Sequence, residues 1–165
     1  LGLSAACYGI AESAMGAASI LGSLSVVVLA KRLRVRHLAI VLVSFGISLI
    51  PSGIAFLLPA DTFTRYLILL VMFCTCQFGC SLFSTYAISL IQGRTPEHLM
   101  GKVMSYVFTL SMCAQPVGQM VYGALFDRFA DIPHWVLIPS GAIVCLIGLC
   151  SAGFFRRLEQ EKPVA

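Results

Sequence analysis

Long apolar runs alternate with short charged connectors along the whole chain. The runs cover about 9–30, 38–58, 66–91, 103–126 and 134–155. Each has about 20 residues or more, the length that an α-helix needs to cross a hydrocarbon core of about 30 Å, whereas a spanning strand needs about 10. The pattern therefore predicts an all-α membrane protein with five transmembrane helices. We expect residues 1–8 to form a surface segment that leads into the first helix.

The segment 92–102 is the connector whose exclusion from the membrane follows most clearly from its charges. It cannot enter hydrocarbon, because Arg94, Glu97 and Lys102 would each cost roughly 2–3 kcal/mol or more at the centre of the bilayer. The run that follows, 103–126, carries no charge. This boundary predicts that the fourth span begins close to Val103.

The composition supports this assignment and leaves no room for a soluble domain. Hydrophobic residues make up 59% of the 165 residues and charged residues only 11%, whereas soluble domains have about 25% charged residues. The net charge of +4 does not indicate nucleic-acid binding, because almost all of the basic residues lie in connectors between the runs. We therefore expect the lipid bilayer, and no nucleic acid, as a partner.

Lysine and arginine are distributed unevenly between the two sides of the predicted membrane. Nine of the eleven lie in alternate connectors and the tail: Lys31, Arg32, Arg34, Arg36, Arg94, Lys102, Arg156, Arg157 and Lys162. The opposite side holds only Arg65 and Arg128. The positive-inside rule places the nine in the cytoplasm. The N-terminus of the chain is then outside and the C-terminus is cytoplasmic.

The cysteines do not form a recognisable framework. There are seven, all within apolar runs: Cys7, Cys74, Cys76, Cys80, Cys113, Cys145 and Cys150. An odd number argues against a set of disulfides, and the spacing without a nearby histidine is a poor zinc site. We interpret them as small apolar packing residues, and we expect no metal site.

Polar residues recur at helical spacing inside three spans, where function in a membrane protein usually resides. The third span carries Gln77, Ser81, Thr85 and Ser89, and the fourth carries Ser111, Gln115, Gln119 and Tyr122. The second carries a weaker set, Ser44, Ser48 and Ser52. These stripes are candidates for lining a water-filled cavity. The alternative is that they join helices through hydrogen bonds of about 0.6 kcal/mol each.

Glu12 is the only carboxylate inside a predicted span, and it shares a small, polar face with Gly16, Ser19 and Ser23. A carboxylate at membrane depth is a candidate proton carrier, because it can load and release a proton as a cavity opens to either side. The alternative is that Glu12 lies within one turn of the outer headgroups and is simply hydrated.

Small residues and one proline predict close helix packing and a kink. Ala18 with Gly22, and Ala114 with Gly118, are pairs of small residues four apart that allow helices to approach closely. Pro116 removes a backbone hydrogen bond and predicts a kink in the fourth span. Gly123 is a further candidate packing position on the same span.

Two segments together resemble a known family. Residues 91–103 read I-Q-G-R-T-P-E-H-L-M-G-K-V, and residues 115–127 read Q-P-V-G-Q-M-V-Y-G-A-L-F-D. The chain resembles the major facilitator superfamily, in particular the macrolide-efflux-like branch of bacterial drug:proton antiporters. In that branch, the loop between helices ten and eleven reads like Q-x-x-x-P-x-x-x-x-G-[RK]-V, and helix eleven carries P-x-G with a later glycine.

The resemblance implies that the five spans are helices eight to twelve of a twelve-helix transporter, in the cytoplasmic membrane of a bacterium. The chain would then be most of the C-terminal six-helix half, and the missing N-terminal part of the same protein would be its partner. The implied function is alternating-access export of a small amphiphilic compound with a proton as the coupling ion and without a cofactor. One feature departs from the family, because the basic loop 31–36 contains no acidic residue for a charge latch.

Two other classes of function remain open. A membrane-embedded enzyme would need a catalytic set at membrane depth, but His37, His98 and His134 lie in or next to connectors. No span contains a zinc-protease or serine-hydrolase motif, so we expect no enzymatic activity. A non-transporting membrane scaffold or sensor is compatible with polar stripes that serve only in packing.

Overall fold

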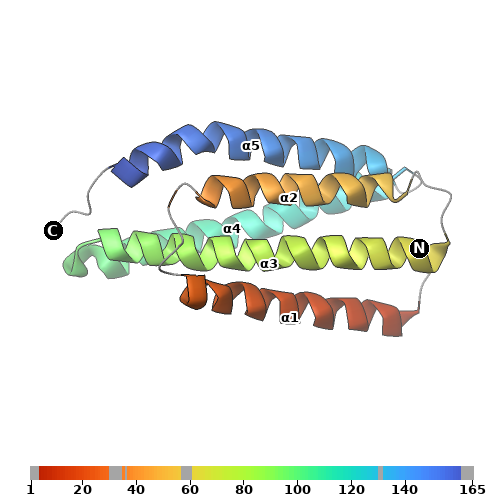
Figure 1. Cartoon of the computed structure of the whole chain (residues 1–165), viewed down its shortest axis with the longest axis horizontal. Coiled ribbons are helices and arrows are strands. Elements are labelled where there is room, and N and C mark those ends of the chain that lie inside the picture. The colour runs from red at the N-terminus through yellow and green to blue at the C-terminus, as the bar shows by residue number, and fades with distance from the viewer. Residues whose placement is uncertain (1–3, 30–34, 36, 57–60, 130–131, 161–165) are drawn as a thin grey trace.

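Five α-helices and no strand make up the part of the chain that the structure describes, residues 4–29, 35, 37–56, 61–129 and 132–160 of a computed structural model. The helices are α1 (Ala5–Leu29), α2 (His37–Ile54), α3 (Thr62–Arg94), α4 (Glu97–Arg128) and α5 (His134–Gln160). They run side by side in alternating directions, as Figure 1 shows. The prediction of an all-α protein with five helices is confirmed.

Four of the helices are long and apolar enough to cross a membrane. They contain the segments Ala5–Leu29, His37–Ile54, Thr62–Arg94 and His134–Phe155. The helix α4 is not among them, because serine, threonine, glutamine and tyrosine residues lower the mean hydropathy even of its uncharged part, residues 103–126. The chain is therefore a multi-pass membrane protein, and the fifth span stays a prediction.

The helix boundaries differ from the predicted spans at two places. The helix α1 already begins at Ala5, where the Ser4 carbonyl accepts from the N–H groups of Cys7 and Tyr8 at 3.0 and 3.4 Å, so residues 5–8 are helical. Their place at the membrane surface stays a prediction. Alanines favour helix here, and no proline interrupts them. At the other boundary, α2 ends at Ile54 rather than near 58, because the backbone tightens there: the Phe56 N–H donates to the carbonyl of Gly53, only three residues back.

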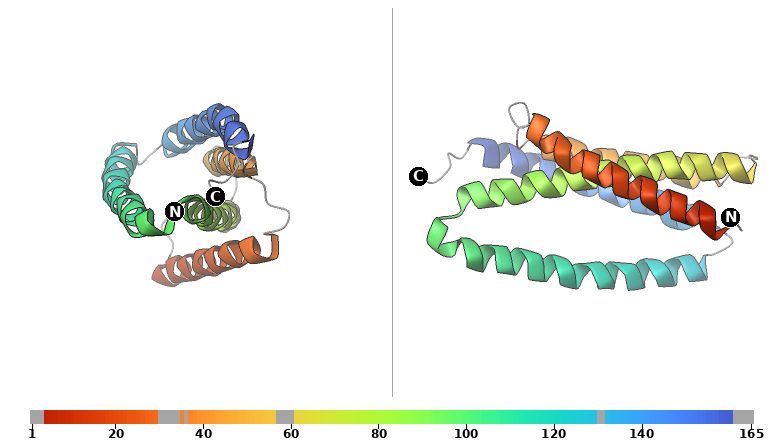
Figure 2. Two further views of the ribbon diagram at one scale, coloured as in Figure 1. Left: turned by 90° about the vertical axis from the view of Figure 1, so that its left-hand side faces the viewer. Right: turned by 90° about the horizontal axis from the view of Figure 1, so that it is seen from below.

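The helix α2 is an inner member of a four-helix layer in the order α1, α3, α2, α5. It packs against α5 on one side and α3 on the other, and α3 in turn packs against α1. The helix α4 stands apart from this layer along most of its length, as both views in Figure 2 show. The buried residues follow this arrangement, since α2 contains seven buried residues and α4 only one, Met104.

Glycines bring α2 and α5 into close contact. Gly46 and Gly53 on α2 are seven residues apart, as are Gly141 and Gly148 on α5. A Cβ at Gly46 would collide with the carbonyl oxygen of Gly141 and the thiol of Cys145, and one at Gly148 would come within 2.9 Å of the Val43 backbone nitrogen. Small residues of this kind let the two backbones approach, which is how helices gain contact area in lipid.

Glycines also allow α3 to lie close to its two neighbours, α2 and α1. Gly79 of α3 accommodates the ring of Phe45 from α2, and that ring makes an edge contact with Phe83 at a centroid distance of 6.4 Å. On the other side, a Cβ at Gly22 of α1 would collide with the backbone carbonyl of Phe78. Gly22 is thus a point where the backbones of α1 and α3 lie close together.

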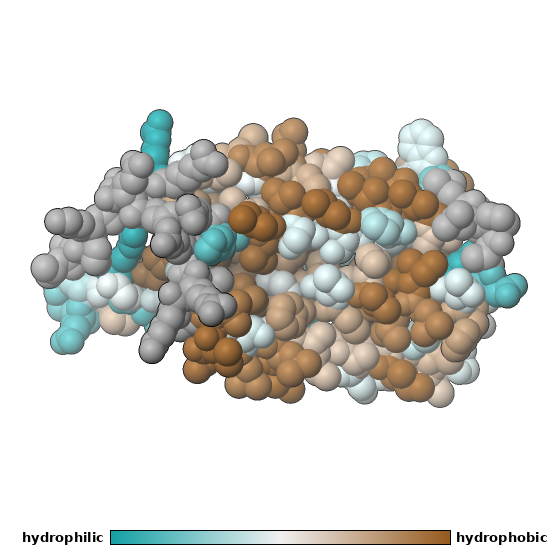
Figure 3. Space-filling view, viewed as in Figure 1, coloured by the Kyte–Doolittle hydropathy of each residue, from teal (hydrophilic) through white to brown (hydrophobic). Residues whose placement is uncertain are grey.

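The ends and the middle of the bundle differ in polarity. The end of α1, the start of α2, the turn between α3 and α4 and the end of α5 lie at one end of the molecule (Figure 1). The connectors that contain most of the lysines and arginines join the helices at this end. Between the two ends the surface is largely apolar (Figure 3). The run 31–34 and Arg36, which bear on the charge latch, lie outside the described residues.

Replacing Gly22 with alanine should destabilise the protein. The new methyl group has to push α3 away from α1, and overpacking of this kind costs about 1–3 kcal/mol. The measurement is the free energy of unfolding of the purified protein in detergent.

Gly16→Ala on the same helix is the matched control, because a Cβ there meets nothing within 4 Å. It should be neutral or slightly stabilising, since alanine favours helix over glycine by about 0.5–1 kcal/mol. Equal stabilities of the two variants would show that α1 and α3 are not in backbone contact at Gly22.

Candidate functional site

A seam of hydroxyl groups joins α1 to α3. Ser19 and Ser81 hydrogen-bond to one another at 2.5 Å, and Thr85 donates to the hydroxyl of Ser23 at 3.4 Å. Both contacts lie next to Gly22, where the two backbones are closest. Ser81 and Thr85 belong to the polar stripe predicted as cavity lining, and in this structure both hydroxyls are engaged between two helices.

The other two members of the α3 stripe are differently placed. Gln77 is exposed, and Ser89 is exposed with its hydroxyl donating to the Thr85 carbonyl at 2.9 Å. The stripe drifts around the helix, because a spacing of four residues exceeds the 3.6 residues of one turn. The four positions therefore do not share one environment, and a cavity-lining role along the whole stripe stays a prediction.

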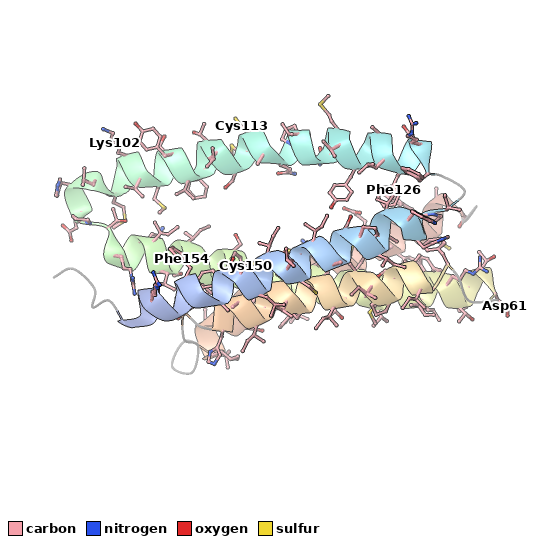
Figure 4. The ribbon with its side chains drawn as sticks, turned by 90° about the horizontal axis from the view of Figure 1, so that it is seen from above. Asp61, Lys102, Cys113, Phe126, Cys150 and Phe154 are labelled. Carbon is pink, nitrogen blue, oxygen red and sulfur yellow. The ribbon has the colours of Figure 1, made fainter. Side chains whose placement is uncertain are left out.

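The α4 stripe faces the other helices without packing against them. Figure 4 shows Phe126 pointing from α4 toward the layer, whereas Cys113 points away from it. Tyr122, Gln119 and Gln115 precede Phe126 by 4, 7 and 11 residues, which places them on the same side of the helix. All three are exposed. This face carries two amides and a phenol with no helix covering them in the described chain.

The contact at the start of α4 fixes this orientation. Met104 is buried there, and its sulfur accepts from the side-chain amide of Gln92 at 3.8 Å. Ser111 lies seven residues beyond Met104 on the same side, but its hydroxyl donates to the Val107 carbonyl of its own helix at 2.8 Å. The first turns of α4 therefore hold the helix in register while the glutamines further along remain uncovered.

The proposed kink and packing positions of α4 lie in this uncovered region. The helix continues through Pro116 without interruption and is gently curved in Figure 4. Beside Gly118 and Gly123, a Cβ would meet nothing within 4 Å among the described residues. Their predicted packing role therefore has no counterpart in the contacts seen here, in contrast to that of Gly22.

Glu12 lies on α1 near the end of the bundle that carries few basic residues. Its side chain is exposed, as is the neighbouring Gly16. The same end is joined to α3 by Tyr66, whose hydroxyl donates to the Cys7 carbonyl at 2.8 Å. Glu12 therefore does not share the packed environment of Ser19 and Ser23, although all three were expected on one face. Its part in proton transfer stays a prediction.

The serines of α2 have a simpler arrangement. The hydroxyls of Ser48 and Ser52 donate to the carbonyls four residues before them, at 2.9 and 3.0 Å, and Ser44 donates to Val41 at 2.6 Å. Ser52 is 1% exposed. Because each hydroxyl is satisfied within its own helix, the weaker stripe bonds to no other helix through these groups.

The cysteines and histidines form no metal centre among the described residues. None of the seven cysteines takes part in a disulfide, and no group of three or more histidine, cysteine, aspartate or glutamate side chains converges there. The thiol of Cys145 instead approaches the Val43 carbonyl at 3.6 Å in the α2–α5 contact. That position agrees with the interpretation of the cysteines as packing residues.

One cavity was not expected from the sequence. It has a volume of about 410 Å³ and lies at the basic end, where the start of α2, the end of α3 and the end of α5 meet. Its lining consists of Val35, Leu38, Ala87, Leu90, Ile91, Arg94, Thr95, Phe154 and Phe155. The only sequence signal was an arginine that ends one apolar run and a pair of phenylalanines that ends another.

The apolar surface between the two ends, the charged connectors and the helix lengths together define the class of protein: a multi-pass α-helical membrane protein. The chain is 29% identical over 107 residues to macrolide efflux protein A of Streptococcus pyogenes, and equally to the protein of that name from serotype M6, strain ATCC BAA-946 / MGAS10394. The similarity covers 64% of this chain but 24% of each relative. The chain thus spans about a quarter of the length of the curated relatives that it matches. No protein-family model and no solved structure matches it.

The Ser19–Ser81 contact should be measurable by a double-mutant cycle. Replacing either serine with alanine removes the same hydrogen bond, so the double variant should be less destabilised than the sum of the two, with a coupling of about 0.6 kcal/mol. The measurement is again the free energy of unfolding in detergent.

Ser25→Ala serves as the control, because the Ser25 hydroxyl donates only to the Leu21 carbonyl of its own helix at 2.7 Å. Its combination with Ser81→Ala should be additive. Additivity of Ser19→Ala with Ser81→Ala would contradict a direct contact between the two hydroxyls.

Proposed function

We propose that the full-length protein is a secondary active transporter of the major facilitator superfamily that exports small amphiphilic compounds. The observation that carries this proposal is the similarity of 107 residues to macrolide efflux proteins, in a chain whose helices are built to cross a membrane. A transporter of this kind works by alternating access, in which one helical bundle rocks against another around a central site. The proposed role is therefore not enzymatic, and it needs no cofactor.

In this proposal the five helices are helices eight to twelve, and α4 is a fifth membrane span. Each half of such a transporter consists of two inverted three-helix repeats. In one repeat α3, α4 and α5 follow each other, and in the other an upstream helix precedes α1 and α2. Because α3 packs on both α1 and α2, its upstream counterpart would pack on α4 and α5. The separation of α4 from the layer (Figure 2) supports a helix at that place.

The uncovered face of α4 is the proposed contribution of this chain to the transport pathway. Gln115, Gln119 and Tyr122 are exposed on the side that faces the other helices. In a bilayer, amide groups need water, substrate or another polar side chain as a partner, because hydrocarbon offers none. An aqueous cavity that admits an amphiphilic solute satisfies this requirement.

Proton influx is the proposed driving force, with Glu12 as its carrier in this chain. Glu12 is exposed on α1. A carboxylate that reaches both water and a cavity can take up and release protons during the cycle.

One observation favours the second candidate, a non-transporting scaffold or sensor. Ser81 and Thr85 are engaged in the α1–α3 seam, so this half of the polar pattern is already explained by packing. The two candidates differ in what they require of α4, since only a transporter needs water beside its glutamines.

Water access to α4 can be measured by cysteine labelling of the full-length protein. With all native cysteines replaced, Gln119→Cys should react with a membrane-impermeant methanethiosulfonate about tenfold faster than native Cys113 retained alone, because a thiolate forms only in contact with water. Cys113 is the matched control on the opposite side of the same helix (Figure 4). Equal protection of both positions would favour the scaffold.

Transport itself is tested with the full-length protein in vesicles under an imposed pH gradient. A fluorescent lipophilic drug should move with the gradient and stop when an uncoupler is added, and Glu12→Gln should reduce this movement about tenfold or more, because the amide cannot carry a proton. Glu97→Gln is the control. It removes another exposed carboxylate, at the start of α4, and the variant should transport normally.

Two results would count against these assignments. If Glu12→Gln retained gradient-driven movement, Glu12 would be a hydrated interfacial residue and the coupling group would lie elsewhere. If no tested compound moved with the wild-type protein, the drug-efflux assignment itself would be wrong, while the membrane architecture would be unaffected.

A further inference from the structure

Two cysteine thiols meet at the middle of α3. Cys76 and Cys80 are one helical turn apart, which places their side chains on the same face, and the two thiols interact directly with one another. Neither forms a disulfide. Cys76 lies 14 residues after Thr62, where α3 begins, and Cys80 lies 14 residues before Arg94, where it ends. The pair is therefore about 20 Å from either end of the helix, at the middle of the span.

The pair faces away from the packed side of α3. Leu82 is 7% exposed, and Cys80, two positions before it, points about 160° away from it around the helix. Cys80 is accordingly exposed and Cys76 half-buried. Ala87 is on the side of Cys76, three turns further along, and lines the cavity at the basic end together with Phe154. Figure 4 shows Phe154 on the side of α5 that faces α4, so the thiols lie on the side of the layer that α4 leaves uncovered.

The surroundings of the pair restrict what it can bind. Among the described residues, no third cysteine, histidine, aspartate or glutamate joins these two thiols. A structural zinc ion takes four protein ligands. A monovalent copper ion between two thiolates leaves a net negative charge, which is costly at membrane depth. The pair therefore suits a ligand that needs two sulfur atoms and forms an uncharged product with them.

We propose that Cys76 and Cys80 form a binding site for trivalent arsenic compounds that carry one organic group. The arsenic atom of such a compound has two exchangeable hydroxyl groups. Two As–O bonds break, two As–S bonds form, and each thiol proton leaves in a molecule of water. The arsenic stays trivalent, so the step needs no oxidant or reductant, and the product is neutral.

The organic group of the ligand also finds a suitable neighbour. Phe73 lies three residues before Cys76 on the same face of α3 and is 37% exposed. An apolar or aromatic substituent on the arsenic can pack against this ring. The proposal depends on the geometry of α3 and not on the transport activity.

The experiment counts arsenic groups on the full-length protein in mild detergent. All cysteines except Cys76 and Cys80 are replaced with serine, and the protein is treated with phenylarsine oxide, which hydrates to the dihydroxy form. Intact-protein mass spectrometry should show one phenylarsenic group. This group should survive an excess of glutathione, because the second thiol acts at a high effective concentration, and 2,3-dimercaptopropanol, a competing dithiol, should remove it.

The matched control retains Cys74 and Cys80 instead. It has the same number of thiols on the same helix, but they are six residues apart and lie on different faces. Because only one thiol can then hold the arsenic, the control should lose its phenylarsenic group to glutathione about a hundredfold faster. Elution of both variants as a single monodisperse peak shows that they have folded.

Three results would overturn the proposal. Equal rates of loss from the two variants would show that the spacing of Cys76 and Cys80 gives no second bond to arsenic. Two phenylarsenic groups on the Cys76 and Cys80 variant would show that the thiols react separately. Labelling of this variant only after it has been unfolded would show that another helix of the full-length protein covers the pair.

Discussion

Close backbone contact at glycines is the interaction on which the rest of this structure depends. Lipid tails are as apolar as leucine, so helices in a membrane gain little from burying hydrophobic side chains against each other and associate through packing and hydrogen bonds instead. In this chain, Gly46 and Gly141 bring α2 to α5, Gly79 brings α2 to α3, and Gly22 brings α3 to α1. Each helix of the four-helix layer is thus joined to its neighbour where a side chain is missing.

The surroundings of the polar side chains follow from this packing. Where backbones are close, as at Gly22, short hydroxyl side chains can reach across, and Ser19 meets Ser81. Where α4 has no neighbour, its longer amides remain exposed on the inner face. Whether a polar side chain bonds to another helix or stays exposed is therefore set by which helices are in contact.

The separation of α4 from the four-helix layer leaves most of its surface open. A helix with apolar side chains such as Leu110 and Met120 both 75% exposed is covered by lipid or by another helix. In the proposed inverted-repeat arrangement, an upstream helix would contact one side of α4 and lipid the other. The cavity at the basic end is bounded by the start of α2, the end of α3 and the end of α5.

The sequence by itself determined the elements and their class, because a spanning helix needs only length and apolarity, and charge alone interrupts the runs. It determined the five helices to within a few residues and gathered the basic connectors at one end. It could not say which face of each helix meets which neighbour. In lipid, helices are apolar on most sides and show no stripe that faces a core, so the spacing that marked Gly22 as a packing position did not say that α3 is the helix it meets. Only the tertiary structure decided that Ser81 bonds to another helix while Gln119 does not, because contact between distant segments depends on backbone distances that spacing along one helix does not encode.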